Sequence, residues 1–363
     1  MVREAVKFGP DIEHAAEYEQ ELTRDILAEM AATQRDNADR HRHAHRDAHA
    51  KSHAVLKATV TVHESLPPEL AQGIFAEPRT FDAVVRLSSS PGDIRTDRTP
   101  APRGCALKVI GVEGERLVPD IGGNNQDVLM VNFPTLAFGT IAKYKDMLSL
   151  LEKAAKAPET LQRLTTGAMS IARDVATSAG LTPGATLEGL GRDNSHVLGE
   201  TYFTQAALRY GDFVAKLSVS PKSANVRALT GVQMDVDDFS AIRDLVVDYF
   251  KSNDAEYELR AQLCTDIDAM PVEDAAVLWS EDASPHRPVA TIRINRQDTY
   301  GPARRAYGDD TLTFNPWNGV QDHRPLGSIM RVRKHAYERS TAYRHEYNAR
   351  KRVEPSSLDD IPD

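Results

Sequence analysis

Cysteine and long apolar stretches are both scarce in this sequence. Its 363 residues include two cysteines, Cys105 and Cys264, and each stands in an apolar, strand-like context. This placement predicts two buried free thiols instead of a disulfide, as is usual in a reducing compartment. No apolar run is long enough to span a bilayer, and the first twenty residues lack the apolar core of a secretory signal. We therefore expect a cytoplasmic protein without a membrane span.

An excess of basic residues is also missing. The chain has 44 Lys and Arg against 53 Asp and Glu, which gives a formal net charge of −9. A nucleic-acid partner is not expected, because binding to phosphates depends on a dominant basic face. Hydrophobic residues make up 41% of the chain, enough for the core of a globular protein.

Alternation of apolar and polar residues indicates β-strands in several places. In AVLKATVTV (54–62), every second residue from Leu56 to Val62 is apolar, which is the period of a strand with one buried face. Helix-period segments are expected at 12–40, 138–156, 158–180, 237–252 and 328–352. The strand candidates are 54–62, 81–89, 105–112, 127–132, 213–220, 257–264, 275–281 and 289–294. Four strands, a helical insertion and four more strands predict an α+β protein built on an antiparallel barrel or sandwich.

The helix expected at 328–352 carries two tyrosines, each with arginines at helical spacing. Arg333, Tyr337 and Arg344 are separated by four and seven residues, so they share one face of the helix. Arg339, Tyr343 and Arg350 repeat this spacing six residues later, and spacing alone does not choose between the two sets. An arginine beside a tyrosine stabilises the phenolate by charge attraction. A phenolate is a strong ligand for ferric iron, and a tyrosine-ligated haem is known in catalases.

Five segments, found in order along the chain, resemble the haem catalase superfamily. They are KSHAVLKATVTV (51–62), VVRLSSSPGDIRTDRTPAPRGCALKVIGVEGERL (84–117), GGNNQDVLMVNFP (122–134), FNPW (314–317) and RKHAY (333–337). The stretch HRPLGSIMRVRKHAY (323–337) is similar to the compact catalase-related proteins. That branch includes organic-peroxide-dependent peroxidases and allene oxide synthases, which act on fatty acid hydroperoxides.

The resemblance implies a fold and a cofactor. The expected fold is a catalase-like, eight-stranded antiparallel β-barrel with helical insertions and a C-terminal helix that carries the haem ligand. The implied organisation is an N-terminal helical arm (1–48), a haem domain (49–352) and a short tail (353–363). The expected cofactor is haem b.

The same resemblance assigns cofactor-binding residues. Tyr337 matches the axial ligand of the haem iron, and Arg333 is the residue that polarises it. Arg344 and Arg86 match arginines that pair with the haem propionates. Buried carboxylates require cationic, bidentate partners of this kind.

The distal side of the haem requires a base that moves a proton between the peroxide oxygens, and histidine suits that role. The segment 41–55 holds five histidines, and the register of the following strand favours His53, with His49 as the alternative. Ser88 matches a serine that hydrogen-bonds the distal imidazole. Asn124 matches the amide that orients the peroxide, and its neighbour Asn125 is the alternative.

The expected activity is the reduction of hydrogen peroxide or organic hydroperoxides, with a peroxide and a small organic reductant as partners. Leu87 stands where the family has phenylalanine, and VLMVNFP lacks the paired phenylalanines of many catalases. These departures predict a more accessible pocket and favour peroxidase turnover of bulkier hydroperoxides. The alternatives are a fatty acid hydroperoxide isomerase or lyase, and a haem-less barrel that serves as an interaction module. The sequence leaves open whether the protein is a homo-oligomer.

Overall fold

The computed structural model describes residues 4–98, 100–119, 123–136, 138–146, 148 and 194–363. Within these ranges, nine strands form a single sheet, and every strand pairing is antiparallel. The strands are β1 (Lys51–Val62), β2 (Thr80–Ser89), β3 (Arg103–Ile110), β4 (Asn125–Val131), β5 (Tyr202–Phe203), β6 (Leu208–Tyr210), β7 (Phe213–Pro221), β8 (Ala255–Leu263) and β9 (Arg287–Ile294).

The sheet closes into a barrel. Its strand order is β5-β4-β3-β2-β1-β9-β8-β7-β6, and an additional pairing joins β5 to β7. Eight strands therefore complete the ring, while β6 pairs with β7 at its edge. The expected eight-stranded antiparallel barrel is confirmed.

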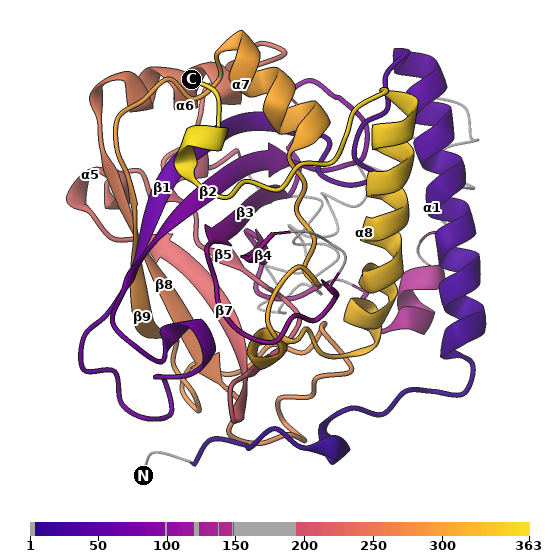
Figure 1. Cartoon of the computed structure of the whole chain (residues 1–363), viewed down its shortest axis with the longest axis vertical. Coiled ribbons are helices and arrows are strands. Elements are labelled where there is room, and N and C mark those ends of the chain that lie inside the picture. Colours follow the sequence, from indigo (N-terminus) through magenta and orange to yellow (C-terminus); the bar gives the residue numbers. More distant parts are fainter. Residues whose placement is uncertain (1–3, 99, 120–122, 137, 147, 149–193) are drawn as a thin grey trace, which may run out of the picture.

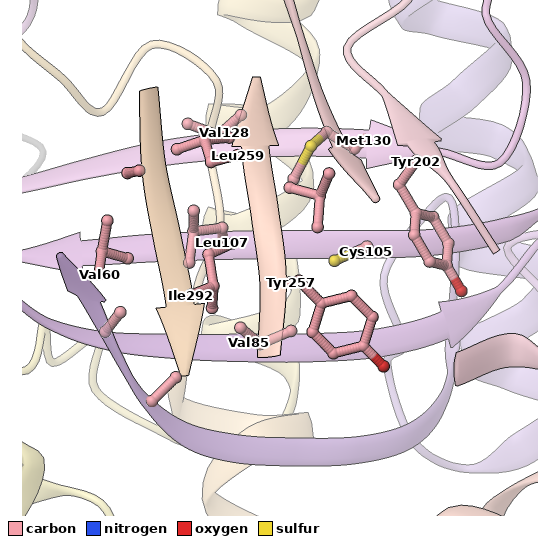
Figure 2. Packing of buried hydrophobic residues seen from close by; sticks show 14 of the residues in the cluster. Val60, Val85, Cys105, Leu107, Val128, Met130, Tyr202, Tyr257, Leu259 and Ile292 are labelled. Carbon is pink, nitrogen blue, oxygen red and sulfur yellow. The ribbon is translucent and has the colours of Figure 1, made fainter. Parts of the chain in front are cut away.

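The barrel interior is the main hydrophobic core. Figure 2 shows side chains from opposite walls meeting there, among them Val85, Leu107, Leu259 and Ile292. Each comes from an inward position of its strand, which explains the period of two in the sequence. Cys105 also points inward, and burial raises the pKa of its thiol to about 12. Both cysteines are buried and free, as expected.

Two long helices lie side by side next to the barrel (Figure 1). They are α1 (Glu19–His41) and α8 (Ser328–Tyr347), and the Gln34 side-chain amide donates to the Ser340 carbonyl at 3.1 Å. The described residues also form the shorter α-helices α5 (Ala224–Arg227), α6 (Ala241–Ser252) and α7 (Pro302–Ala306). A π-helical segment (Tyr307–Thr311) follows α7. None of the helices in the described ranges is long and apolar enough to cross a membrane.

One expected strand is absent from the barrel, and part of the expected helical insertion lies outside the described residues. Residues 275–281 form turns and irregular backbone instead of a strand, and the apolar signal there comes from Trp279, which is buried in a separate cluster outside the barrel core. The barrel uses the two-residue β5 in place of that predicted strand. Of the helix expected at 138–156, residues 141–146 and 148 are helical and the rest lies outside the described residues, as do residues 158–180.

Residues 353–363, expected as a tail, pack against the outer face of the barrel. We call them the C-terminal strap. Leu358 and Ile361 contact the apolar cluster that includes Val55 and Val84 on the outward faces of β1 and β2. Glu354 forms a buried ion pair with Lys108 of β3, with 2.6 Å between Oε2 and Nζ. The strap is therefore part of the packed domain.

Candidate active site

The two faces of strand β2 lead to two different environments. Leu87 and Ser89 point toward the barrel interior, whereas Arg86 and Ser88 point outward, because side chains alternate along a strand. The outward face is the one that α8 and the C-terminal strap approach. Leu87 therefore lies in the barrel core, and the leucine expected to open a pocket does not widen one on the outward face.

A β-bulge at the start of β1 determines where His53 points. The pairing with β2 shifts between Ser52 and Ala54, which leaves His53 as the extra residue. Its Nε2 lies 2.6 Å from the Ser89 hydroxyl, on the inward side. The Arg103 guanidinium donates to the same hydroxyl at 2.6 Å. Burial and the charge of Arg103 hold the pKa of His53 well below its usual range.

His49 lies on the outward side, next to Ser88. Its Nδ1 is 3.5 Å from the Ser88 hydroxyl, and its backbone adopts the left-handed conformation with φ of 50°. Gly104, opposite Ser88 on β3, makes this packing feasible. A Cβ at Gly104 would lie 2.6 Å from His49 Nδ1 and 2.7 Å from the Ser88 oxygen. Burial, Arg86 and Arg333 lower the pKa of His49 to about 3, so this imidazole is neutral at neutral pH.

Helix α8 distinguishes between the two arginine–tyrosine sets. The Arg333 guanidinium donates to the Tyr337 hydroxyl at 2.7 Å. Arg344, on the same face, is only 2% exposed. In the second set, Arg339 and Arg350 are exposed to solvent. The structure therefore brings together the set that contains Tyr337.

Three buried or half-buried arginines gather at the outward face, near the C-terminal half of α8. Arg46 donates to the carbonyls of Gly308 and Leu312 at 2.8 and 2.7 Å, and Arg344 donates to the same Leu312 carbonyl at 3.2 Å. Arg86 donates to the His49 carbonyl at 3.0 Å, and its Nε has no hydrogen-bond partner among the described residues. We call Arg46, Arg86 and Arg344 the arginine cluster. The sequence did not single out Arg46. It favoured His53, seven residues after Arg46, whereas the histidine on the side of the arginine cluster is His49, only three residues after Arg46.

The arginine cluster carries more positive charge than its surroundings balance. Burial and repulsion from Arg46 lower the pKa of Arg86 to about 9, and burial with repulsion from Arg46 and Arg86 lowers that of Arg344. Asp309 and Asp310 offset part of this charge, although Asp310 also pairs with His43 at 2.8 Å, and Asp309 lies 3.9 Å from Arg305. A buried surplus of guanidinium groups is a site for an anion. The two propionates of a haem fit this surplus, and the phenol of Tyr337 is a suitable iron ligand.

The predicted distal amides lie elsewhere. Asn124 is exposed, and its carbonyl accepts from the Val112 amide. Asn125 is buried and donates to the Pro355 carbonyl of the C-terminal strap at 3.1 Å. Asn125 pairs with Ile110, six residues along β3 from Gly104, a separation of roughly 20 Å for an extended chain. The structure does not bring either amide to His49.

Two of the three remaining histidines of the tract make carboxylate contacts, and the third, His45, packs its ring against theirs. His41 lies 2.6 Å from Asp93, and His43 lies 2.8 Å from Asp310. In the part of the chain that the structure describes, no three His, Cys, Asp or Glu side chains are grouped to hold a metal ion.

Comparison with solved structures identifies the architecture as catalase-like. A fungal catalase aligns with a TM-score of 0.57 and 15% identity, covering 96% of this chain and 67% of that one. A bacterial catalase aligns with a TM-score of 0.56 and 15% identity, covering 97% and 66%. Catalase A from Saccharomyces cerevisiae aligns with a TM-score of 0.56 and 16% identity, covering 97% and 72%.

Identities this low establish the fold but neither an activity nor a ligand. The chain spans about two thirds of the length of the fungal and bacterial catalases. No family model and no curated protein matches the sequence.

Proposed function

We propose that this protein is a haem-dependent oxidoreductase that reduces peroxides, in the manner of a catalase or peroxidase. The observation that carries the proposal is the convergence on one face of the barrel of three elements. They are the Arg333–Tyr337 hydrogen bond, the arginine cluster and the His49–Ser88 contact. The catalase-like fold supports the same conclusion.

In this proposal, residues of α8 and of the outward faces of β1 and β2 would hold haem b. Tyr337 would bind the haem iron through its oxygen, which accepts a hydrogen bond from the Arg333 guanidinium at 2.7 Å. The arginine cluster pairs with the two propionates, which neutralises a positive charge that is otherwise buried without full compensation. Bound haem would supply the iron and the redox equivalents for cleavage of the peroxide bond.

His49, the alternative in the sequence, takes the place of His53 as the distal base. A neutral imidazole can accept the proton of the bound peroxide and return it to the departing oxygen. Its low pKa keeps it neutral, and the hydroxyl of Ser88 orients its ring. His53 instead has a structural role inside the barrel end, where it contacts Ser89.

The net reaction consumes one peroxide, two electrons and two protons. Hydrogen peroxide gives two water molecules, and an organic hydroperoxide gives an alcohol and one water molecule. A small organic reductant, or a second hydrogen peroxide molecule that becomes dioxygen, supplies the electrons. A hydroperoxide isomerase would need no external electrons, so identification of the product separates the two activities.

The test is a haemin titration of the purified protein, followed by absorption spectroscopy. We expect a Soret band with the character of a phenolate-ligated ferric haem. Tyr337→Phe should abolish that character, whereas Tyr343→Phe, a matched change on the same helix, should leave it intact. Product analysis with hydrogen peroxide and cumene hydroperoxide then follows. A protein that takes up no haem under these conditions contradicts the proposal and favours a haem-less barrel.

A further inference from the structure

Met330 is a buried methionine whose sulfur contacts the candidate active site. It lies in the first turn of α8, and 6% of its surface is exposed. Its sulfur accepts a hydrogen bond from Nη1 of Arg333 at 3.4 Å, and Nη2 of the same guanidinium donates to the Tyr337 hydroxyl at 2.7 Å. One guanidinium therefore joins this thioether to the phenol that the proposed function assigns to the haem iron.

Space for an additional atom lies beside the Met330 side chain. Met330 lines a partly open cavity of about 40 Å³, together with apolar residues of β4 and β7 such as Leu129 and Leu217. A water molecule needs roughly 10–15 Å³ measured in this way, so the two oxygen atoms of hydrogen peroxide have room in the cavity. The single oxygen of an oxidised methionine needs less space than the peroxide that delivers it.

A thioether beside a strong hydrogen-bond donor is suited to oxidation by a peroxide. A lone pair of the sulfur attacks one peroxide oxygen, an S–O bond forms and the O–O bond breaks. The sulfur is oxidised by two electrons, and the peroxide is reduced. The departing hydroxide takes the proton of the transferred oxygen, so the products are methionine sulfoxide and water. A guanidinium has five N–H donors, so Arg333 can donate to the departing oxygen as well.

We propose that Met330 is a site of oxidation by hydrogen peroxide, and that its sulfoxide draws the Arg333 guanidinium away from Tyr337. The effect on the haem rests on the proposed function, whereas the oxidation itself does not. A thioether sulfur is only a weak acceptor, and oxidation makes the side chain polar. The sulfoxide oxygen therefore competes with the Tyr337 oxygen for Arg333. A phenol that loses its cationic neighbour forms the phenolate less readily and binds ferric iron more weakly.

Two other buried methionines provide internal controls. Met234 is 7% exposed, slightly more than Met330, and packs in the main hydrophobic core. Met270 is 1% exposed, and its sulfur accepts a hydrogen bond from the Thr265 amide, a neutral donor, at 3.4 Å. Neither residue lines the cavity beside Met330. Met234 thus controls for exposure, and Met270 controls for a hydrogen bond to sulfur.

The first experiment measures the oxidation in the absence of haem. The purified haem-free protein is treated with hydrogen peroxide, and peptide mass spectrometry follows the gain of one oxygen at each methionine. We expect Met330 to be oxidised more than threefold faster than Met234 and Met270. A rate at Met330 that is threefold that of Met234 or less would show that exposure alone sets its reactivity, and would overturn the assignment. This result does not depend on the proposed function.

The second experiment measures the consequence for haem binding. After removal of the peroxide, oxidised and untreated proteins are titrated with haemin. We expect the affinity of the oxidised protein to be at least tenfold lower. Met330→Leu, a change that nearly conserves volume, should bind haemin like the untreated protein both before and after peroxide treatment. Met330→Gln, which places an amide oxygen at this position, should bind as weakly as the oxidised protein.

The outcomes separate the two proposals. An equal loss of affinity in peroxide-treated Met330→Leu would assign the effect to another residue and overturn the role of Met330, while the proposed function would stand. If the untreated protein binds no haemin, the proposed function fails. Selective oxidation of Met330 in that protein would still establish the modification site, but its effect on a haem would be refuted.

Discussion

His49 and His53 lie four residues apart in the chain, yet their imidazoles lie on opposite faces of the β1–β2 ladder. His49 contacts the outward Ser88, and His53 contacts the inward Ser89. His49 precedes β1 and has a left-handed backbone conformation, whereas His53 is the extra residue of the bulge between Ser52 and Ala54. These two local departures from an extended chain accompany the separation of a histidine at the candidate active site from one enclosed in the barrel.

The first prediction distinguishes the roles of these two histidines. His49→Ala should retain the haem spectrum and lower kcat/KM for hydrogen peroxide by about 10²–10⁴-fold, the usual contribution of a general acid–base group. His53→Ala should leave peroxide turnover within a few-fold of the unmodified protein. Because His53 is buried and hydrogen-bonded, its removal should instead lower the free energy of unfolding by about 1–3 kcal/mol. Steady-state kinetics and chemical denaturation of both variants provide the measurement, and loss of turnover in His53→Ala alone would reverse the assignment.

The second prediction concerns the arginine cluster, where one substitution should have opposite effects on the apoprotein and on haem binding. Arg344→Gln removes a buried charge that Arg46 and Arg86 repel. Arg46 still satisfies the Leu312 carbonyl, whereas the Asp309 carbonyl loses the Arg344 guanidinium as its donor. We expect the apoprotein to keep its stability or gain up to about 1 kcal/mol. Haem affinity should fall at least tenfold, because a propionate loses its partner. Arg350→Gln, at an exposed position three residues after the end of α8, is the matched control and should change neither quantity; unaltered haem affinity in Arg344→Gln would contradict the propionate role.

The third prediction is a loss of stability in acid. Burial lowers the pKa of His49 and His323 to about 3, and that of His286 and His345 to about 4. In the unfolded chain these groups bind protons near pH 6.5, so between about pH 6.5 and 4 the unfolded state holds more protons than the folded state. The free energy of unfolding should therefore decrease as the pH falls through this window, by up to about 1.4 kcal/mol per pH unit for each such histidine. Denaturant titrations of the apoprotein at pH 7, 6, 5 and 4.5 measure this slope.

Asp127 provides the internal check on that slope. Burial raises the pKa of this carboxyl from 3.8 to about 6. Between pH 4 and 6 the folded state therefore holds more protons on Asp127 than the unfolded state, and this group stabilises the fold as the pH falls. Asp127→Asn should make the acid loss of stability steeper over this range. A flat or rising profile in the unmodified protein, or a shallower one in Asp127→Asn, would conflict with these shifts.

The fourth prediction concerns the buried ion pairs that attach the C-terminal strap. The Lys108 ammonium lies 2.7 Å from Asp127 and 2.6 Å from Glu354, and its side chain is fully buried. Lys108→Met leaves two buried carboxylates without their cation and should cost about 3–5 kcal/mol at pH 7. Glu354→Gln should cost less, because Lys108 keeps Asp127. Thermal and denaturant unfolding of the two variants give the comparison, and an equal or reversed order would show that the strap does not depend on this pair.

The sequence predicted the parts of this structure that follow from local periodicity. Alternation from Leu56 to Val62 indicated a strand with one buried face, and the spacing of Arg333, Tyr337 and Arg344 indicated one helix face. Both patterns depend only on the chain's own geometry. The barrel closure and the position of Arg333 beside Tyr337 agree with them.

Features that depend on pairing between distant segments were not predicted. The bulge at His53 is a property of the β1–β2 register, and no residue type in the strand indicates its position. Arg46 gains its role from segments more than 260 residues away, through the carbonyls of Gly308 and Leu312. The two residues of β5 are too short to produce a periodic signal, whereas the apolar run around Trp279 produced one without forming a strand.

The short strand β5 also has a mechanical consequence for the whole barrel. A closed barrel resists deformation through its continuous strand pairing. Here the closure depends on one residue pair between β4 and β5 and two between β5 and β7. Thermal breathing should concentrate at such a weak junction. Backbone amides of β5 and of the adjoining end of β4 should exchange with solvent deuterium earlier than those at the centres of β2 and β8. The barrel is thus expected to open first at the pairings of β5, while the other strands stay paired.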